Sequence, residues 1–200
     1  MLRHNVRPRF LATAGMALGA ALLLPATALA ATFVGTAGPD HLVGTASADT
    51  MSGLGGNDVL EGRGGADTIR GGDGADTIYG GDGNDWLYGG DGPDHVFGGY
   101  GADRMWGGSG ADVLSGGPGA DVIYGGDGPD VLYGGDGPDL LVGGAGRDIV
   151  YGGAGNDIIV VGGDRAADVV HCGTGWDVAY LGRYDVADSS CERVIRRLEP

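Results

Sequence analysis

A period of nine residues runs through the middle of the chain. Aspartate recurs at every ninth position from Asp40 to Asp157 without a gap, which defines fourteen consecutive units over residues 35–160. In each unit position 1 is Gly, position 6 is Asp and position 8 is apolar. The position-8 residues are Leu42, Met51, Leu60, Ile69, Ile78, Leu87, Val96, Met105, Leu114, Ile123, Leu132, Leu141, Val150 and Ile159. A unit this short cannot bury its apolar residue alone, so the repeat predicts a solenoid of stacked units.

Glycine dominates the first half of each unit. Position 4 is Gly in every unit except the one that contains Ser47. Position 2 is Gly from Gly72 onward, and earlier it is held by Thr36, Thr45, Leu54 and Arg63. Because Gly permits positive φ, these positions predict tight turns. Positions 7–9 then form a three-residue strand whose middle side chain points inward. Successive strands should alternate between two parallel sheets, so that turns on one edge are 18 residues apart.

These units resemble the RTX, or haemolysin-type calcium-binding, repeats, whose pattern is G-G-x-G-x-D-x-U-x with U a large apolar residue. Fourteen uninterrupted copies make the resemblance specific. It implies an all-β fold, a right-handed parallel β-roll. In that fold the first six residues of a unit turn around Ca²⁺, and the last three form the strand.

The resemblance also implies the metal ligands. Ca²⁺ takes six to eight oxygen ligands, and in this family the position-6 Asp supplies the side-chain ligand while backbone carbonyls supply most of the rest. The expected carboxylates are Asp58, Asp67, Asp76, Asp85, Asp94, Asp103, Asp112, Asp121, Asp130, Asp139, Asp148 and Asp157. The expected carbonyls are those of Gly72, Gly74, Gly81, Gly83, Gly90, Gly92, Gly126, Gly128, Gly135 and Gly137. The alternative is that each Asp is only a turn-forming residue.

The composition of the chain opposes folding in two ways that bound calcium would have to offset. The chain contains 46 Gly among 200 residues and has a formal net charge of −15. Ordering Gly costs backbone entropy, and like charges repel one another. We therefore expect several calcium ions to bind and the folding of the chain to be coupled to that binding. The acidic balance and the absence of Lys argue against a nucleic-acid partner.

Residues 1–30 have the organisation of a secretory signal peptide. A basic segment precedes the apolar run from Phe10 to Leu24, and Ala28 and Ala30 provide the small-x-small cleavage pattern. The apolar run is shorter than the roughly 20 residues of a membrane span, which leaves a membrane anchor as the weaker alternative. The sequence therefore predicts a secreted, extracellular protein with no membrane span.

The repeat domain is expected to cover residues 31–160, and residues 161–200 are expected to form degenerate repeats and a C-terminal cap. In an exported protein the two cysteines, Cys172 and Cys191, predict one disulfide, because a zinc site would lack two further ligands. This tail resembles that of secreted actinobacterial calcium-binding repeat proteins. We expect Val194, Ile195 and Leu198 to cover the end of the core.

Aromatic residues recur at position 9, where side chains should face outward. They form two expected ladders, one of Tyr79–Phe97 followed by Tyr133–Tyr151, and one of Tyr88–Trp106–Tyr124. The ladders either stabilise the sheets by stacking or present a platform for a glycan or a protein partner. The motifs H-E-x-x-H and G-x-S-x-G are missing, so the chain is not expected to be an enzyme. An adhesion or carbohydrate-binding module and an accessory subunit of a secreted enzyme are the alternative functions.

Overall fold

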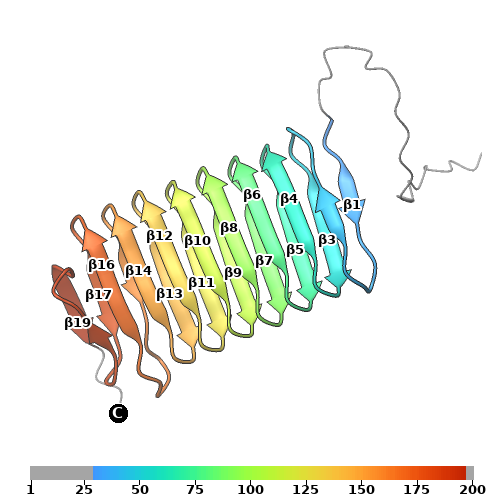
Figure 1. Cartoon of the computed structure of the whole chain (residues 1–200). Coiled ribbons are helices and arrows are strands. Elements are labelled where there is room, and N and C mark those ends of the chain that lie inside the picture. Colours follow the sequence, from blue (N-terminus) through green and yellow to red (C-terminus); the bar gives the residue numbers. More distant parts are fainter. Residues whose placement is uncertain (1–28, 197–200) are drawn as a thin grey trace, which may run out of the picture.

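The computed structural model describes residues 29–196, and there the chain is a parallel β-solenoid of two sheets (Figure 1). The ten-stranded sheet consists, in spatial order, of β1 (Thr32–Val34), β3 (Thr50–Gly55), β5 (Thr68–Asp73), β7 (Trp86–Asp91), β9 (Arg104–Ser109), β11 (Val122–Asp127), β13 (Leu140–Ala145), β15 (Ile158–Val160), β17 (Val178–Leu181) and β19 (Arg193–Arg196). The nine-stranded sheet consists of β18 (Val186–Ala187), β16 (Val169–Thr174), β14 (Ile149–Ala154), β12 (Val131–Asp136), β10 (Val113–Pro118), β8 (His95–Tyr100), β6 (Thr77–Asp82), β4 (Val59–Gly64) and β2 (His41–Val43). The signal-peptide prediction rests almost entirely on residues outside the described part of the chain.

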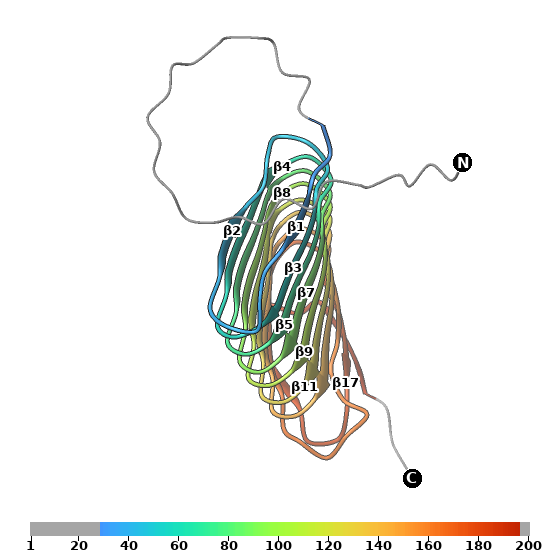
Figure 2. The same cartoon turned by 90° about the vertical axis from the view of Figure 1, so that its right-hand side faces the viewer.

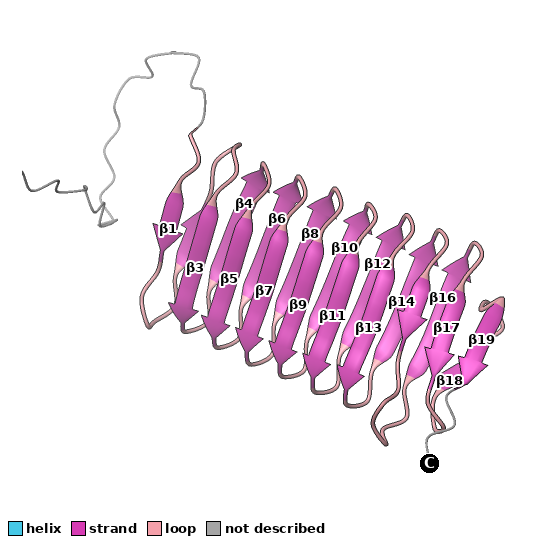
Figure 3. Cartoon of the chain, turned by 180° about the vertical axis from the view of Figure 1, so that it is seen from behind, coloured by secondary structure: helices cyan, strands magenta, loops and turns pink. Residues whose placement is uncertain are grey.

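Successive strands alternate between the two sheets, as the period predicts. Each strand pairs in parallel with the strand two further along the chain, so that Ile78 of β6 lies beside Val96 of β8. The view along the solenoid shows the two sheets as two flat layers joined by turns at both edges (Figure 2). Figure 3 shows the same arrangement from behind, as strands joined by short loops. In residues 29–196 no helix is long and apolar enough to cross a membrane.

The strands are longer than the sequence predicts. From β3 to β14 each strand has six residues and continues through positions 1–3 of the following unit. The glycines take part in the ladder, as the pairing of Gly81 with Gly99 and of Asp82 with Tyr100 shows. The expectation of three-residue strands is therefore wrong for these twelve strands and holds only for β1, β2 and β15. The turn proper is confined to positions 4–6.

The core is formed by one inward-pointing apolar side chain from each strand, contributed alternately by the two sheets. Every position-8 residue from Met51 to Ile159 is fully buried, with 0% of its surface exposed. The neighbouring positions 7 and 9 are half-buried or exposed, as the alternation of side chains along a strand requires. Leu42 packs against this core but is only partly buried, since it belongs to the second strand from the open end.

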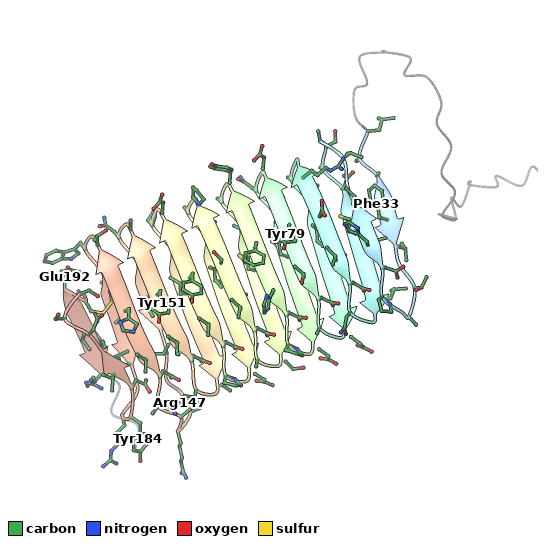
Figure 4. All side chains as sticks on the ribbon, in the orientation of Figure 1. Phe33, Tyr79, Arg147, Tyr151, Tyr184 and Glu192 are labelled. Atoms are coloured by element: carbon green, nitrogen blue, oxygen red, sulfur yellow. A yellow bond between two sulfur atoms is a disulfide. The ribbon has the colours of Figure 1, made fainter. Side chains whose placement is uncertain are left out.

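The expected aromatic ladders are present on the outer faces. Tyr79 stacks on Phe97 with ring centroids 5.1 Å apart, and Tyr133 stacks on Tyr151 at 5.0 Å. Figure 4 shows Tyr79 and Tyr151 on the same face of the roll. On the other sheet Trp106 lies between two tyrosines in a stacked row: Tyr88 at 4.7 Å and Tyr124 at 5.7 Å. Each ring covers the flat face of its neighbour, so these contacts stabilise the sheets.

The period changes near the C-terminal end. An insertion after β15 lengthens the repeat, so that Ile149 of β14 pairs with Val169 of β16, 20 residues later. The expected disulfide is present between Cys172 and Cys191, whose Cα atoms are 5.0 Å apart. Val194 lies in register with the buried Ala179 and is 41% exposed, because β19 is the last strand of its sheet. That Val194 and Ile195 cover the end of the core stays a prediction, and Leu198 lies outside the described residues.

Candidate metal centre

The position-6 aspartates form two columns, one along each edge of the roll. Each turn places its Asp directly above the Asp 18 residues earlier, and all twelve expected ligands from Asp58 to Asp157 are at most 3% exposed. The backbone N–H of Asp76 donates to Oδ1 of Asp94 at 2.9 Å, and the N–H of Asp94 donates to Oδ1 of Asp112 at 2.8 Å. This pattern repeats down both columns, so one oxygen of each interior carboxylate has a backbone donor.

The second carboxylate oxygen, Oδ2, has no hydrogen-bond partner in most of the turns. Among the described residues this holds for Asp58, Asp67, Asp76, Asp85, Asp94, Asp103, Asp112, Asp121, Asp130, Asp139, Asp148, Asp157, Asp168 and Asp177. A buried acceptor without a donor is costly, and a charged one more so. Fourteen such atoms in two rows require either protons or cations close by.

The invariant Gly at position 1 lies against this orphan oxygen. A Cβ on Gly71 would collide with Oδ2 of Asp76 and would lie 2.6 Å from the carbonyl oxygen of Gly89 in the next turn of the same edge. The orphan carboxylate oxygen of Asp76 and the carbonyl oxygen of Gly89, one coil further along the roll, thus both lie close to Gly71. Hard oxygen ligands that converge in this way suit Ca²⁺.

Glycine at positions 2 and 4 is explained by the stacking of carbonyls. Gly90 has φ +125°, and a Cβ on it would collide with the carbonyl oxygen of Gly72; Gly92 stands in the same relation to Gly74. All ten carbonyls expected as ligands point along the stack in this way toward the glycine 18 residues later. The position-4 carbonyls lie in the turns and the position-2 carbonyls in the ends of the adjoining strands, so carboxylate and carbonyl oxygens occur together along each edge of the roll.

Carboxylates alone do not complete a metal site. Within residues 29–196 no three His, Cys, Asp or Glu side chains gather in a group that could hold a metal ion. Because each turn contributes a single column carboxylate, backbone carbonyls must supply the remaining oxygens of any calcium shell. The donor set therefore fits a hard, oxygen-loving cation and not zinc, which prefers nitrogen and sulfur.

Burial changes the acidity of the columns. Loss of hydration raises the pKa of Asp85, Asp94, Asp121 and Asp130 to about 7, and like charges in adjacent turns add to the rise, while the backbone hydrogen bond to each carboxylate opposes it. Without a cation these groups hold protons near neutral pH. A divalent ion that binds there must displace those protons.

The columns extend beyond the residues that the sequence indicated. The N–H of Asp148 donates to Oδ1 of Asp168, and that of Asp157 donates to Oδ1 of Asp177, both at 2.9 Å. Asp168 and Asp177 each have an orphan Oδ2 as well. They were missed because the insertion shifts the spacing from 18 to 20 residues. The signal was present in the sequence, since each still stands two residues before an inward apolar residue, Val170 and Ala179.

A parallel roll edged by stacked carboxylates and glycine carbonyls defines a class of calcium-binding β-solenoids. The model of the RTX calcium-binding nonapeptide repeat matches the chain in four copies, at residues 34–69, 61–96, 97–132 and 133–166. These matches span more than half of the chain, and the protein belongs to the RTX calcium-binding repeat family. Its repeats are calcium-binding repeats, and their β-solenoid is a structural fold. No curated protein sequence matches the chain significantly.

Proposed function

We propose that this chain is a secreted, non-enzymatic calcium-binding protein whose folding is coupled to several Ca²⁺ ions. The observation that carries the proposal is the row of buried carboxylate oxygens without partners at each edge of the roll. The proposed ligands are the column carboxylates from Asp58 to Asp157, with Asp168 and Asp177 added, and the carbonyls of position-2 and position-4 glycines. Bound Ca²⁺ neutralises the columns and satisfies their free lone pairs.

The coupling to folding follows from what the roll lacks without metal. Its core holds one apolar side chain per unit of nine residues, while the Gly-rich turns lose much entropy on ordering. The columns stack like charges along both edges and bury them. A ligand that binds only the folded turns stabilises the fold by mass action, so calcium shifts the equilibrium toward the roll.

An extracellular setting agrees with two features. The disulfide between Cys172 and Cys191 is of a kind that persists in oxidising compartments. Extracellular modules also bind calcium weakly, with dissociation constants on the order of 10⁻⁴–10⁻³ M, which suits sites of one carboxylate per turn. The non-enzymatic part of the proposal is supported by the family, since the RTX repeat solenoid is a structural fold. His41 and His171 pair with Glu61 and Asp188 at the surface.

Circular dichroism of the purified chain, with and without calcium, tests the proposal. In excess chelator at pH 8 the β signal should be lost, and it should return when calcium exceeds the chelator. Native mass spectrometry should show several calcium ions on each folded molecule. Magnesium is the matched control, because it is smaller and demands near-octahedral geometry, and it should not restore the signal. An undiminished β signal in chelator would refute the coupling, and a metal-free spectrum in calcium would refute the function.

A further inference from the structure

The first two turns of the roll differ from all the others at position 2. Thr36 and Thr45 stand where later units have Gly, apart from Leu54 and Arg63 in the third and fourth units. Leu54 and Arg63 adopt positive φ values of 81° and 78°, as the later glycines do. The two threonines do not. The backbone therefore takes a second conformation in the first two turns, and β1 and β2 end three residues earlier than the interior strands.

This second conformation satisfies the carboxylate oxygen that is orphaned elsewhere. The backbone N–H of Thr36 donates to Oδ2 of Asp40 at 2.5 Å, and its hydroxyl donates to the same oxygen at 3.0 Å. Thr45 makes the same two hydrogen bonds to Asp49, at 2.6 and 2.9 Å. In the turns stacked directly on them, Oδ2 of Asp58 and Oδ2 of Asp67 have no partner.

The threonine hydroxyl also reaches the second type of oxygen in the turn. Oγ1 of Thr36 lies 3.3 Å from the carbonyl oxygen of Gly38, at position 4 of its unit. Oγ1 of Thr45 lies 3.5 Å from the position-4 carbonyl oxygen of Ser47. The hydroxyl thus lies between the position-6 carboxylate and the position-4 carbonyl. In an interior turn these two oxygens are the ones that would act as ligands of a calcium ion.

We propose that the residue at position 2 decides whether a turn of this roll takes calcium, and that the turns of Asp40 and Asp49 take none. This inference rests on the proposed function. Threonine gives a closed turn, in which its own N–H and hydroxyl occupy the carboxylate. A residue at positive φ gives an open turn, in which Oδ2 is left for the ion. The calcium columns therefore begin at Asp58 and Asp67, and the roll starts with two turns that need no metal.

Counting ions by native mass spectrometry of the full chain in excess calcium tests the proposal in both directions. The double substitution Thr36→Gly and Thr45→Gly opens the first two turns and should add an ion for each turn that is opened. Thr36→Ser with Thr45→Ser keeps both hydroxyls and should leave the count unchanged. A purely structural role for the threonines, as turn formers, predicts no gain from the glycine variant.

The reverse substitution keeps the test decisive if opening the first turns impairs folding. Leu54→Thr with Arg63→Thr closes the third and fourth turns and should remove an ion for each. Leu54→Ala with Arg63→Ala is the matched control, which removes the same side chains without adding a hydroxyl, and it should retain the wild-type count. Equal counts in wild type, Thr variant and Ala variant would overturn the assignment of position 2 alone. A wild-type chain without any bound calcium would overturn the proposed function itself.

Discussion

The interior of the roll and its two ends satisfy the same carboxylates by different means. In the interior, Asp94 receives one backbone donor and leaves Oδ2 free. At the start of the roll Thr45 closes the turn of Asp49, and near the other end the N–H of Gly182 donates to Oδ2 of Asp185 at 2.6 Å. The ends use hydrogen donors of the chain itself, whereas the interior depends on something that the chain does not supply. The difference locates the metal dependence in the interior turns.

The largest expected effect is that of acidification on the stability of the metal-free interior turns. Interior carboxyls such as Asp85 and Asp121 have a folded pKa of about 7, against an ordinary value of 3.8. Between these two pKa values the metal-free roll binds more protons than the unfolded chain. The contribution of these carboxyl groups to the stability of the roll is therefore fully present below about pH 4 and is lost as the pH rises through about 7. In chelator, the β signal by circular dichroism should therefore be much stronger at pH 5 than at pH 8.

Neutral side chains provide the control for that titration. Asp85→Asn with Asp121→Asn removes two charges from one column, so the metal-free signal at pH 8 should move toward its value at pH 5. The same variant should bind fewer calcium ions. If chelated wild-type protein gives the same spectrum at both pH values, the interior carboxyls are not what destabilises the metal-free roll.

The next largest effect is expected from replacing a glycine by alanine, which should destabilise the roll more in its interior than near its C-terminal end. Gly90 and Gly163 have nearly the same φ, +125° and +124°, but a Cβ on Gly90 meets the carbonyl oxygen of Gly72, while a Cβ on Gly163 meets nothing within 4 Å. Gly90→Ala should lower the free energy of unfolding by about 4 kcal/mol, since stacked backbone must move. Gly163→Ala should cost only the conformational strain, about 1 kcal/mol. Chemical denaturation in saturating calcium measures both, and equal losses would contradict the stacking argument.

Loss of the disulfide should have a smaller effect than Gly90→Ala, and one confined to the C-terminal end. Replacing Cys172 and Cys191 by Ser opens a loop of 19 residues, which should cost about 3 kcal/mol by the chain-entropy account. Amide hydrogen exchange in calcium should become faster in β17 and β19 and stay unchanged in β8. Faster exchange along the whole roll would show that the cap and the interior unfold as one unit.

Sequence reasoning predicted the parts of the fold that repeat. The phase of Asp and of the apolar residues placed every core side chain from Met51 to Ile159 and both carboxylate columns, because a strict period leaves a single way to stack the units. It also predicted the disulfide and the stacked aromatic ladders. Strand length was predicted wrongly, because Gly was assigned to turns only, although Gly81 and Gly99 pair within the sheet.

What the sequence did not reveal depends on local geometry. Thr36 appeared only as a departure from the glycine pattern, and its hydrogen bonds to Asp40 become visible once the backbone conformation is known. The end of this column was also not predicted: the N–H of Asp177 donates to Oε2 of Glu192 at 2.9 Å, so a glutamate takes the place that an Asp holds in the interior turns. Thr36 departs from the glycine pattern, and Glu192 lies outside the nine-residue period. Their contacts with the carboxylate columns become visible only in the folded chain.

The alternation of strands between the sheets limits how such a molecule can change in length. Removing eighteen residues takes out one full coil and leaves every later strand on its original sheet. Removing nine residues transfers all later strands to the opposite sheet. A deletion of nine between Trp106 and Tyr124 would therefore place the two rings on different sheets and split the row that they now share. The roll can therefore gain or lose whole coils without disturbing its faces, whereas a half coil would exchange them.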